Sequence, residues 1–362
     1  MSPSRWLAVI VSVAVLAVGV AACGSSNSGS SGELSGQIAG AGSSAQEAAQ
    51  EAWIANFENE NSGATISYDP VGSGGGREQF IAGGTAYGGS DTPLNEDEGE
   101  LKGAMERCKP GELVEIPDYI SPIAIVYNLP GVEELQLSPD TLAAIFNQEI
   151  TTWNDKAIAA DNPGVELPST RITPVNRSDE SGTTENFTDY LYKVAPKVWT
   201  HEPSGDWPVK GGEAAQGTSG VVEAVNAGEG AIGYADASQA GELGIAKVKV
   251  GKEYVGPTAE AAAKILEESP EDKEISQGKD VFAFELDRKT ESQGTYPIVL
   301  VSSLMACTQY GSSSEAELVK AYLEYVVSSE GQEAAAENAG SAPLSDSLRE
   351  QIMPAIEAIE TG

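Results

Sequence analysis

The chain has 362 residues and is strongly acidic, with 55 Asp and Glu against 21 Lys and Arg and a formal net charge of −34. This balance argues against nucleic acid as a partner, because nucleic-acid binding needs a basic surface, and against attachment to anionic lipid by charge alone. One His and three Cys argue against a transition-metal site, so neither metal nor cofactor is expected. The length is typical of two domains.

The first 34 residues have the composition of a signal and a tether. Leu7 to Val20 is almost wholly apolar, which is short for a transmembrane helix and typical of a signal peptide. Val20-Ala21-Ala22-Cys23 resembles a lipobox, at which a bacterial lipoprotein is cleaved and its new N-terminal Cys acylated. The alternative is an ordinary signal peptide with Cys23 incidental. Residues 24–32 are nearly all Ser and Gly, which predicts a flexible tether.

Strands, turns and helices alternate in the next part of the chain. Strands are predicted at Ile38–Gly40, Ala64–Tyr68 and Ala86–Ser90, and helices at Ala45–Phe57, Arg77–Ala82 and Glu96–Met105. This order predicts an open sheet, in which ligands bind beyond the carboxyl ends of the strands. Gly40–Ser44 and Gly72–Gly76 form Gly/Ser turns before two of the helices. Neither turn matches the Lys-bearing P-loop or the dinucleotide fingerprint.

Asp91 ends the third predicted strand, two residues before Pro93. A buried carboxylate at this place can accept a hydrogen bond from a protonated anion. Phosphate carries a proton near neutral pH and sulfate does not, so such an acceptor favours phosphate. Taken alone, Asp91 is better explained as a turn or helix-cap residue before the proline.

Two long apolar strands are predicted farther along, with a second group of elements between them. The strands are Ile116–Tyr127 and Tyr296–Ser303, and each is interpreted as a crossover between two domains. Between them, strands are predicted at Arg171–Val175 and Ala231–Tyr234, and helices at 138–146, Phe187–Val194, a segment ending at Asn226, and Pro257–Glu268. After them, helices are predicted at Glu315–Ser328, Gly331–Ala339 and a closing segment to Ile359.

The stretch Asn176–Phe187 places Ser181, Gly182 and Thr183 at the start of a helix. Such a start offers free backbone N–H groups and the positive end of the helix dipole, and it therefore suits an anion. Arg177, four residues before Ser181, carries a planar fork of donors suited to a tetrahedral oxyanion. An ordinary helix cap preceded by a surface arginine is the alternative.

Together with the two earlier Gly/Ser turns, this stretch identifies a family. The chain resembles the substrate-binding protein of bacterial ABC phosphate transporters over nearly all of its mature length. The motifs that carry the resemblance are Gly40-Ala41-Gly42-Ser43-Ser44, Gly72-Ser73-Gly74-Gly75, Gly89-Ser90-Asp91-Thr92-Pro93-Leu94, Trp153-Asn154-Asp155, Asn162-Pro163-Gly164, Arg177 through Thr183, and Gly230-Ala231-Ile232-Gly233-Tyr234.

The resemblance implies an α/β fold of the type II periplasmic-binding-protein kind, a two-domain clamp with two crossover strands at the hinge. After the signal peptide (1–22) and the tether (23–34), domain I comprises 35–127 with 296–362, and domain II comprises 128–295. It further implies import of inorganic phosphate through an ABC permease, with no chemical reaction. The protein is expected to be a monomer on the outer face of the cell membrane, held only by its lipid anchor.

The same resemblance implies which residues bind phosphate: Ser44, the N–H of Ala45, Ser73, Asp91, Arg177, Ser181, Gly182 and Thr183. With the family match, Asp91 is interpreted as the proton acceptor and Asp179 as the residue that holds Arg177. The family usually has an aromatic residue where this chain has Ala45. Glu180 stands where the family often has a small residue, and the sequence assigns it no role.

The sequence contains three cysteines, Cys23 in the lipobox-like stretch and Cys108 and Cys307 farther along. If Cys23 carries lipid, Cys108 and Cys307 remain as a pair, and an even number in an exported protein favours a disulfide. The resemblance implies that both positions belong to the same discontinuous domain, which makes the bridge geometrically plausible. Two free buried thiols are the alternative.

Other classes of protein explain the sequence less well. A Ser/His/Asp hydrolase would have to use His201, which is far in sequence from the Gly/Ser turns, and no Gly-x-Ser-x-Gly elbow is present. A lipid-anchored adhesion or sensor module fits the tether and the acidity but leaves three anion-like turns unexplained. Another tetrahedral oxyanion is the alternative within the binding class.

Overall fold

The computed structural model describes residues 34–94, 99–271, 276 and 280–362. The predicted signal peptide, nearly all of the predicted tether and Cys23 lie outside this part of the chain. Within it, no helix combines the length and the apolar character that crossing a membrane requires.

The strands form one mixed sheet with the order β2-β1-β3-β11-β4-β8-β6-β7, to which β5, β9 and β10 attach through β4. A separate pair, β12 and β13, lies near the carboxyl terminus. The strands are β1 (Ser35–Gly42), β2 (Gly63–Asp69), β3 (Tyr87–Ser90), β4 (Leu113–Tyr127), β5 (Gln136–Leu137), β6 (Thr173–Arg177), β7 (Glu213–Ala215), β8 (Ala231–Asp236), β9 (Gly244–Val250), β10 (Glu253–Val255), β11 (Val299–Cys307), β12 (Gln309–Tyr310) and β13 (Glu360–Thr361).

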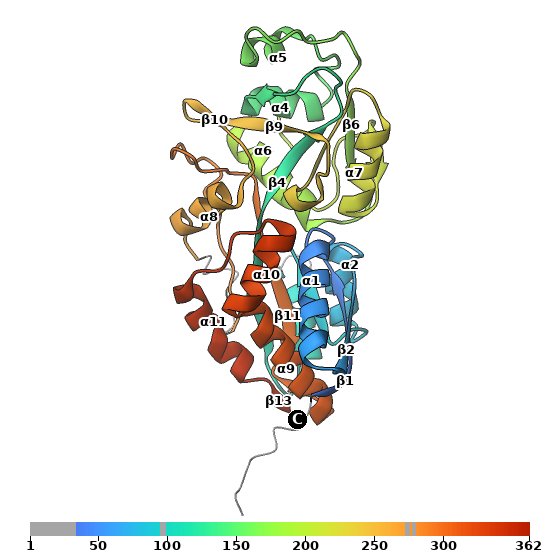
Figure 1. Ribbon diagram of the computed structural model, residues 1–362, viewed down its shortest axis with the longest axis vertical. Helices are drawn as coiled ribbons and strands as arrows, with labels where there is room; N and C mark the ends of the chain where they lie inside the picture. Colours follow the sequence, from blue (N-terminus) through green and yellow to red (C-terminus); the bar gives the residue numbers. More distant parts are fainter. Residues whose placement is uncertain (1–33, 95–98, 272–275, 277–279) are drawn as a thin grey trace, which may run out of the picture. The chain divides into compact units, whose positions relative to one another are not determined.

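Helices cover the sheet (Figure 1). They are α1 (Glu47–Glu60), α2 (Ser73–Ile81), α3 (Glu100–Arg107), α4 (Pro139–Phe146), α5 (Lys156–Asp161), α6 (Gly182–Val194), α7 (Gly217–Ala227), α8 (Ala259–Glu268), α9 (Ser313–Val327), α10 (Ser329–Ala339) and α11 (Asp346–Glu357), with a 3₁₀ turn at Ala237–Gln239. The α1 helix packs on β2 and α10, and α9 packs on β1 (Figure 1).

The strand β4 divides the sheet into two sides. Its residues are all buried, its first part pairs with β11, and its last five residues pair with β8. Below, "the β1–β3 side" means β1, β2 and β3 with α1, α2 and α3, and "the β6–β8 side" means β6, β7 and β8 with α6 and α7. Both predicted crossover strands therefore exist, and they are adjacent and antiparallel.

The bounds of these two strands differ from the prediction at their ends. β4 begins at Leu113, before the predicted start at Ile116, because residues 113–115 pair with β11. The ladder between the two strands is irregular between Ser302 and Ser303 and leaves Asp118 without an opposite residue. β11 continues to Cys307, which forms a disulfide with Cys108 just after α3. Their Cα atoms are 5.1 Å apart, and the predicted bridge is confirmed.

The α2 helix begins at Ser73, four residues before the predicted start at Arg77. The Gly run is therefore the first turn of the helix and not a loop before it. The reason is close packing on β1, because a Cβ placed on Gly76 would lie 2.4 Å from the Cα of Gly42. Glycine is a poor helix former, but here only glycine allows the helix to approach the strand.

Candidate functional site

Residues from both sides of the sheet meet where the parallel strands end. The predicted anion-binding side chains lie in this region and are almost fully buried, with exposed fractions between 1% and 3%: Ser44, Ser73, Asp91, Arg177, Ser181 and Thr183. Ser73 begins α2, and Ser181 caps α6 by accepting a hydrogen bond from the N–H of Thr184. Ser181 is therefore the N-cap of α6, and it also lies in the cluster formed by these six buried side chains.

Asp91 is held by three donors from two elements, α6 and β11. The hydroxyl of Thr183 donates to its Oδ2 at 3.0 Å, and the hydroxyl of Ser302 donates to its Oδ1 at 2.5 Å. The amide of Asn186 donates to the Asp91 carbonyl at 2.8 Å. A carboxylate has about four lone-pair sites, so Asp91 keeps room for another donor. The arrangement therefore suits an acceptor that faces a protonated ligand.

Gly182 brings the β6–β8 side into contact with the β1–β3 side. A Cβ placed on it would lie 2.7 Å from Ser73 Oγ, 2.8 Å from Asp91 Cβ and 3.1 Å from the nitrogen of Thr92. Ser73 Oγ in turn accepts a hydrogen bond from the N–H of Asp91 at 3.1 Å. The start of α6, the start of α2 and the end of β3 thus form one tight junction.

Arg177 lies beside this junction in a fixed orientation. Its Nε donates to Asp179 Oδ1 at 2.9 Å, and its Nη2 pairs with Oδ2 of the same residue. Burial alone would raise the pKa of Asp179, but the Arg177 guanidinium and the N–H of Gly217 hold that pKa below its ordinary value. A Cβ on Gly72 would lie 3.4 Å from Arg177 Nη2, which places the guanidinium against the turn before Ser73. Asp179 is therefore in contact with Arg177 in a geometry that can orient its guanidinium.

Ser44 is contacted from the β6–β8 side. The N–H of Thr218 donates to its Oγ at 3.0 Å, and the two hydroxyls are 3.1 Å apart. Gln239 donates to the Ser44 carbonyl at 2.8 Å. The N–H of Ala45 donates to Ser43 Oγ at 3.0 Å, so an anion would have to compete with Ser43 for that donor.

Sequence reasoning missed two hydroxyls of this cluster. Thr218 lies in the first turn of α7, where its hydroxyl gives no signal of its own in the sequence. Ser302 lies in an apolar strand, where a small hydroxyl residue gives no local signal. Its side chain is fully buried and donates to Asp91 across a sequence separation of 211.

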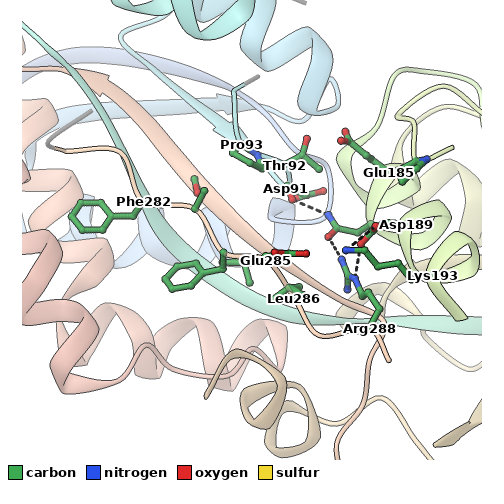
Figure 2. Close-up of a pocket in the computed structure, with 16 residues that line it drawn as sticks. Asp91, Thr92, Pro93, Glu185, Asp189, Lys193, Phe282, Glu285, Leu286 and Arg288 are labelled. Atoms are coloured by element: carbon green, nitrogen blue, oxygen red, sulfur yellow. Dashed lines mark hydrogen bonds and ion pairs between the residues drawn. The ribbon is translucent and has the colours of Figure 1, made fainter. Parts of the chain in front are cut away.

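A pocket of about 220 Å³ lies next to Asp91 (Figure 2). It is formed by the end of β3, by α6, by residues 282–288 and by β11. Among the residues that line it are four carboxylates and two cations: Asp91, Glu185, Asp189, Glu285, Lys193 and Arg288. Figure 2 shows Arg288 facing Asp189, with which it pairs at 3.0 Å. The excess of carboxylates makes this pocket itself unsuited to an anion.

The cluster around Asp91 offers hydroxyl, amide and guanidinium donors together with one carboxylate acceptor. No group of three or more potential metal ligands occurs among the described residues. The ring of His201 packs edge-on against that of Trp199, with the ring centroids 5.1 Å apart. The arrangement is suited to holding a small protonated oxyanion.

Comparison with known proteins first defines the class. A family model described as "PBP superfamily domain" matches residues 27–330, so the chain belongs to that superfamily. A phosphate-binding protein, PfluDING, solved with phosphate, aligns with a TM-score of 0.72 over 88% of this chain and 93% of that one, at 22% identity. A phosphate-binding protein from Stenotrophomonas maltophilia aligns with a TM-score of 0.66 at 19% identity, over 88% and 94%. These likenesses show the predicted two-domain α/β fold.

Sequence relatives then define the family. The chain is 33% identical over 367 residues to phosphate-binding protein PstS 3 of Mycobacterium leprae, covering 96% of this chain and 97% of the relative. It is 34% identical over 319 residues to phosphate-binding protein PstS 2 of Mycobacterium tuberculosis, covering 86% and 84%. The chain is therefore a member of the family of phosphate-binding proteins named PstS.

Proposed function

We propose that this protein binds inorganic phosphate outside the cytoplasm and delivers it to an ABC permease for import, with no bond made or broken. The observation that carries the proposal is the junction at Asp91, where α6 and β11 donate to one carboxylate acceptor at the end of β3 and the starts of α2 and α6 meet. The ligands would be Ser44, the Ala45 N–H, Ser73, Asp91, Arg177, Ser181, Gly182 and Thr183. Thr218 and Ser302 would orient Ser44 and Asp91.

Selection of phosphate would rest on Asp91. Its carboxylate can accept the O–H of a protonated phosphate, which gives a charge-assisted hydrogen bond. Sulfate offers only acceptors at neutral pH, so the same contact would place two acceptors together and cost about 1–3 kcal/mol or more. Arg177 and the start of α6 would neutralise the remaining negative charge.

Calorimetric titration of the tag-free mature chain, freed of bound anion, tests this function. We expect tight binding of phosphate, no heat with sulfate, and a reduced preference in Asp91→Asn. Asp140→Asn, an exposed residue in the first turn of α4, is the matched control and should bind like the wild type. A folded wild-type chain that does not bind phosphate would overturn the function. Equal binding of both anions would remove Asp91 from its role.

We further propose that segments 35–127 with 296–362, and 128–295, act as two domains that close over the anion. The lipobox-like sequence supports a lipid anchor at Cys23 on the outer face of the membrane, and the soluble part would act as a monomer. Release of a Cys23→Ala protein into the medium, with loss of acyl label, is the expected sign of the anchor. Retention of that variant at the membrane would contradict it.

A further inference from the structure

Arg77 and Glu180 form an ion pair between the two sides of the sheet. Arg77 lies on α2, four residues after Ser73, and α2 packs on β1 and β3. Glu180 precedes Ser181 directly, in the turn that leads into α6. Arg77 Nη2 and Glu180 Oε1 are 2.8 Å apart. The pair thus connects the helix start that carries Ser73 with the one that carries Ser181.

The guanidinium of Arg77 is oriented by partners on its own side. Its Nε donates to Glu100 Oε1 at 2.7 Å, and its Nη1 donates to the hydroxyls of Ser90 and Thr92 at 2.9 and 3.0 Å. Ser90 and Thr92 flank Asp91, and the Arg77 side chain is 2% exposed. These partners hold the Arg77 guanidinium independently of Glu180, so the Arg77 side chain loses little entropy when the ion pair forms.

Two glycines make room for the Glu180 carboxylate. A Cβ on Gly74, in the first turn of α2, would lie 1.4 Å from Glu180 Oε2, and a Cβ on Gly205 would lie 2.3 Å from Oε1. The carboxylate occupies a slot in which α2 forms one wall. This slot exists only while α2 and the turn before α6 are together.

We propose that Arg77 and Glu180 are a positioning pair that sets how slowly phosphate leaves the site. Neither residue is among the proposed phosphate ligands. Their contact stabilises the arrangement in which Ser73, Asp91 and Gly182 meet, and a contact present in one conformation alone shifts the equilibrium toward that conformation. The inference rests on the proposed binding of phosphate at that junction. It also gives Glu180 a role that the sequence did not reveal.

Stopped-flow measurement of phosphate association and dissociation tests the pair, with Trp207 as a reporter. Trp207 stacks on Tyr234 at 5.6 Å, and the Tyr234 hydroxyl accepts from the Arg177 N–H. For Glu180→Gln, which keeps the shape of the side chain, we expect release to be about tenfold faster and association nearly unchanged; tenfold is about 1.4 kcal/mol. Glu202→Gln, an exposed control with the same change of charge, should leave both rates unchanged.

Gly74→Ala gives an independent test, since its Cβ would displace the Glu180 carboxylate. It should speed release in the wild-type background and have little further effect in Glu180→Ala. A wild-type protein that does not bind phosphate would overturn the proposed function and this inference with it. Tight wild-type binding with unchanged release from Glu180→Gln would overturn the inference alone. The inference would also be overturned if Glu180→Gln lost the same thermal stability with and without phosphate while its release rate stayed unchanged. That result would indicate that the ion pair is purely structural.

Discussion

At the scale of single residues, Gly182 shows that the junction between the two sides leaves no room for a side chain. Gly182 lies at the start of α6, within van der Waals distance of Ser73 and Asp91. In Gly182→Ala the new Cβ would overlap Ser73 Oγ at 2.7 Å, so the junction cannot form without a shift of one side. We expect phosphate affinity to fall by at least about tenfold, which corresponds to an overpacking cost of about 1–3 kcal/mol. Calorimetric titration measures it.

The control for this substitution is a glycine with room for a methyl group. In Gly220→Ala, within α7, the added Cβ would lie 3.5 Å from Ala215 Cβ, an ordinary contact. Alanine in a helix interior is favoured over glycine by about 0.5–1 kcal/mol, so this variant should bind phosphate normally and melt slightly higher. Normal phosphate binding by Gly182→Ala would show that the junction is looser than the distances imply.

At the scale of elements, local pattern predicted most of the strands and helices, and tertiary contact decided the rest. The apolar runs of β4 and β11 and the capped start of α6 were evident in the sequence. The early start of α2 was not, because a run of glycines predicts a turn unless a neighbouring strand demands close approach. The first residues of β4, Leu113 to Glu115, were likewise outside the predicted strand, and pairing with β11 makes them part of it.

The buried carboxylate of Glu115 on β4 gives a prediction about pH. Burial raises the pKa of Glu115 to about 8, although the N–H of Leu94 and the charge of Arg77 oppose this shift. Between about pH 4.5 and 8 the folded protein keeps a proton that the unfolded chain has released, so this group lowers the free energy of unfolding as the pH rises through that window. Glu115→Gln removes the effect and keeps an acceptor for Leu94.

We therefore expect the melting temperature of Glu115→Gln, relative to the wild type, to be higher by a few degrees at pH 8.5 than at pH 5. Differential scanning calorimetry across this range measures the difference. Glu112→Gln, an exposed neighbour, should show no such trend. A constant difference between Glu115→Gln and the wild type at all pH values would mean that Glu115 does not titrate in this window.

At the scale of the whole molecule, the site is assembled from residues far apart in the sequence. Ser44 contacts Thr218 across 174 positions, and Asp91 contacts Ser302 across 211. The family motifs indicated one partner of each contact, since motifs are local. Their supporting hydroxyls depend on which strands become neighbours in the sheet, and the pairing of Arg77 with Glu180 depends on both sides together. Those contacts required the fold.

The net charge of −34 also acts at this scale, and it opposes the ligand. A phosphate anion approaching the molecule would be repelled by the distant carboxylates, whereas short-range donors, for which we propose Arg177, would hold it once bound. Raising the salt from about 10 mM to about 150 mM shortens the Debye length from about 30 Å to about 8 Å. We therefore expect association to become a few-fold faster while release changes little, as measured by stopped-flow fluorescence. Slower association at higher salt would mean that the positive potential of Arg177 and the helix starts extends beyond the site and dominates capture.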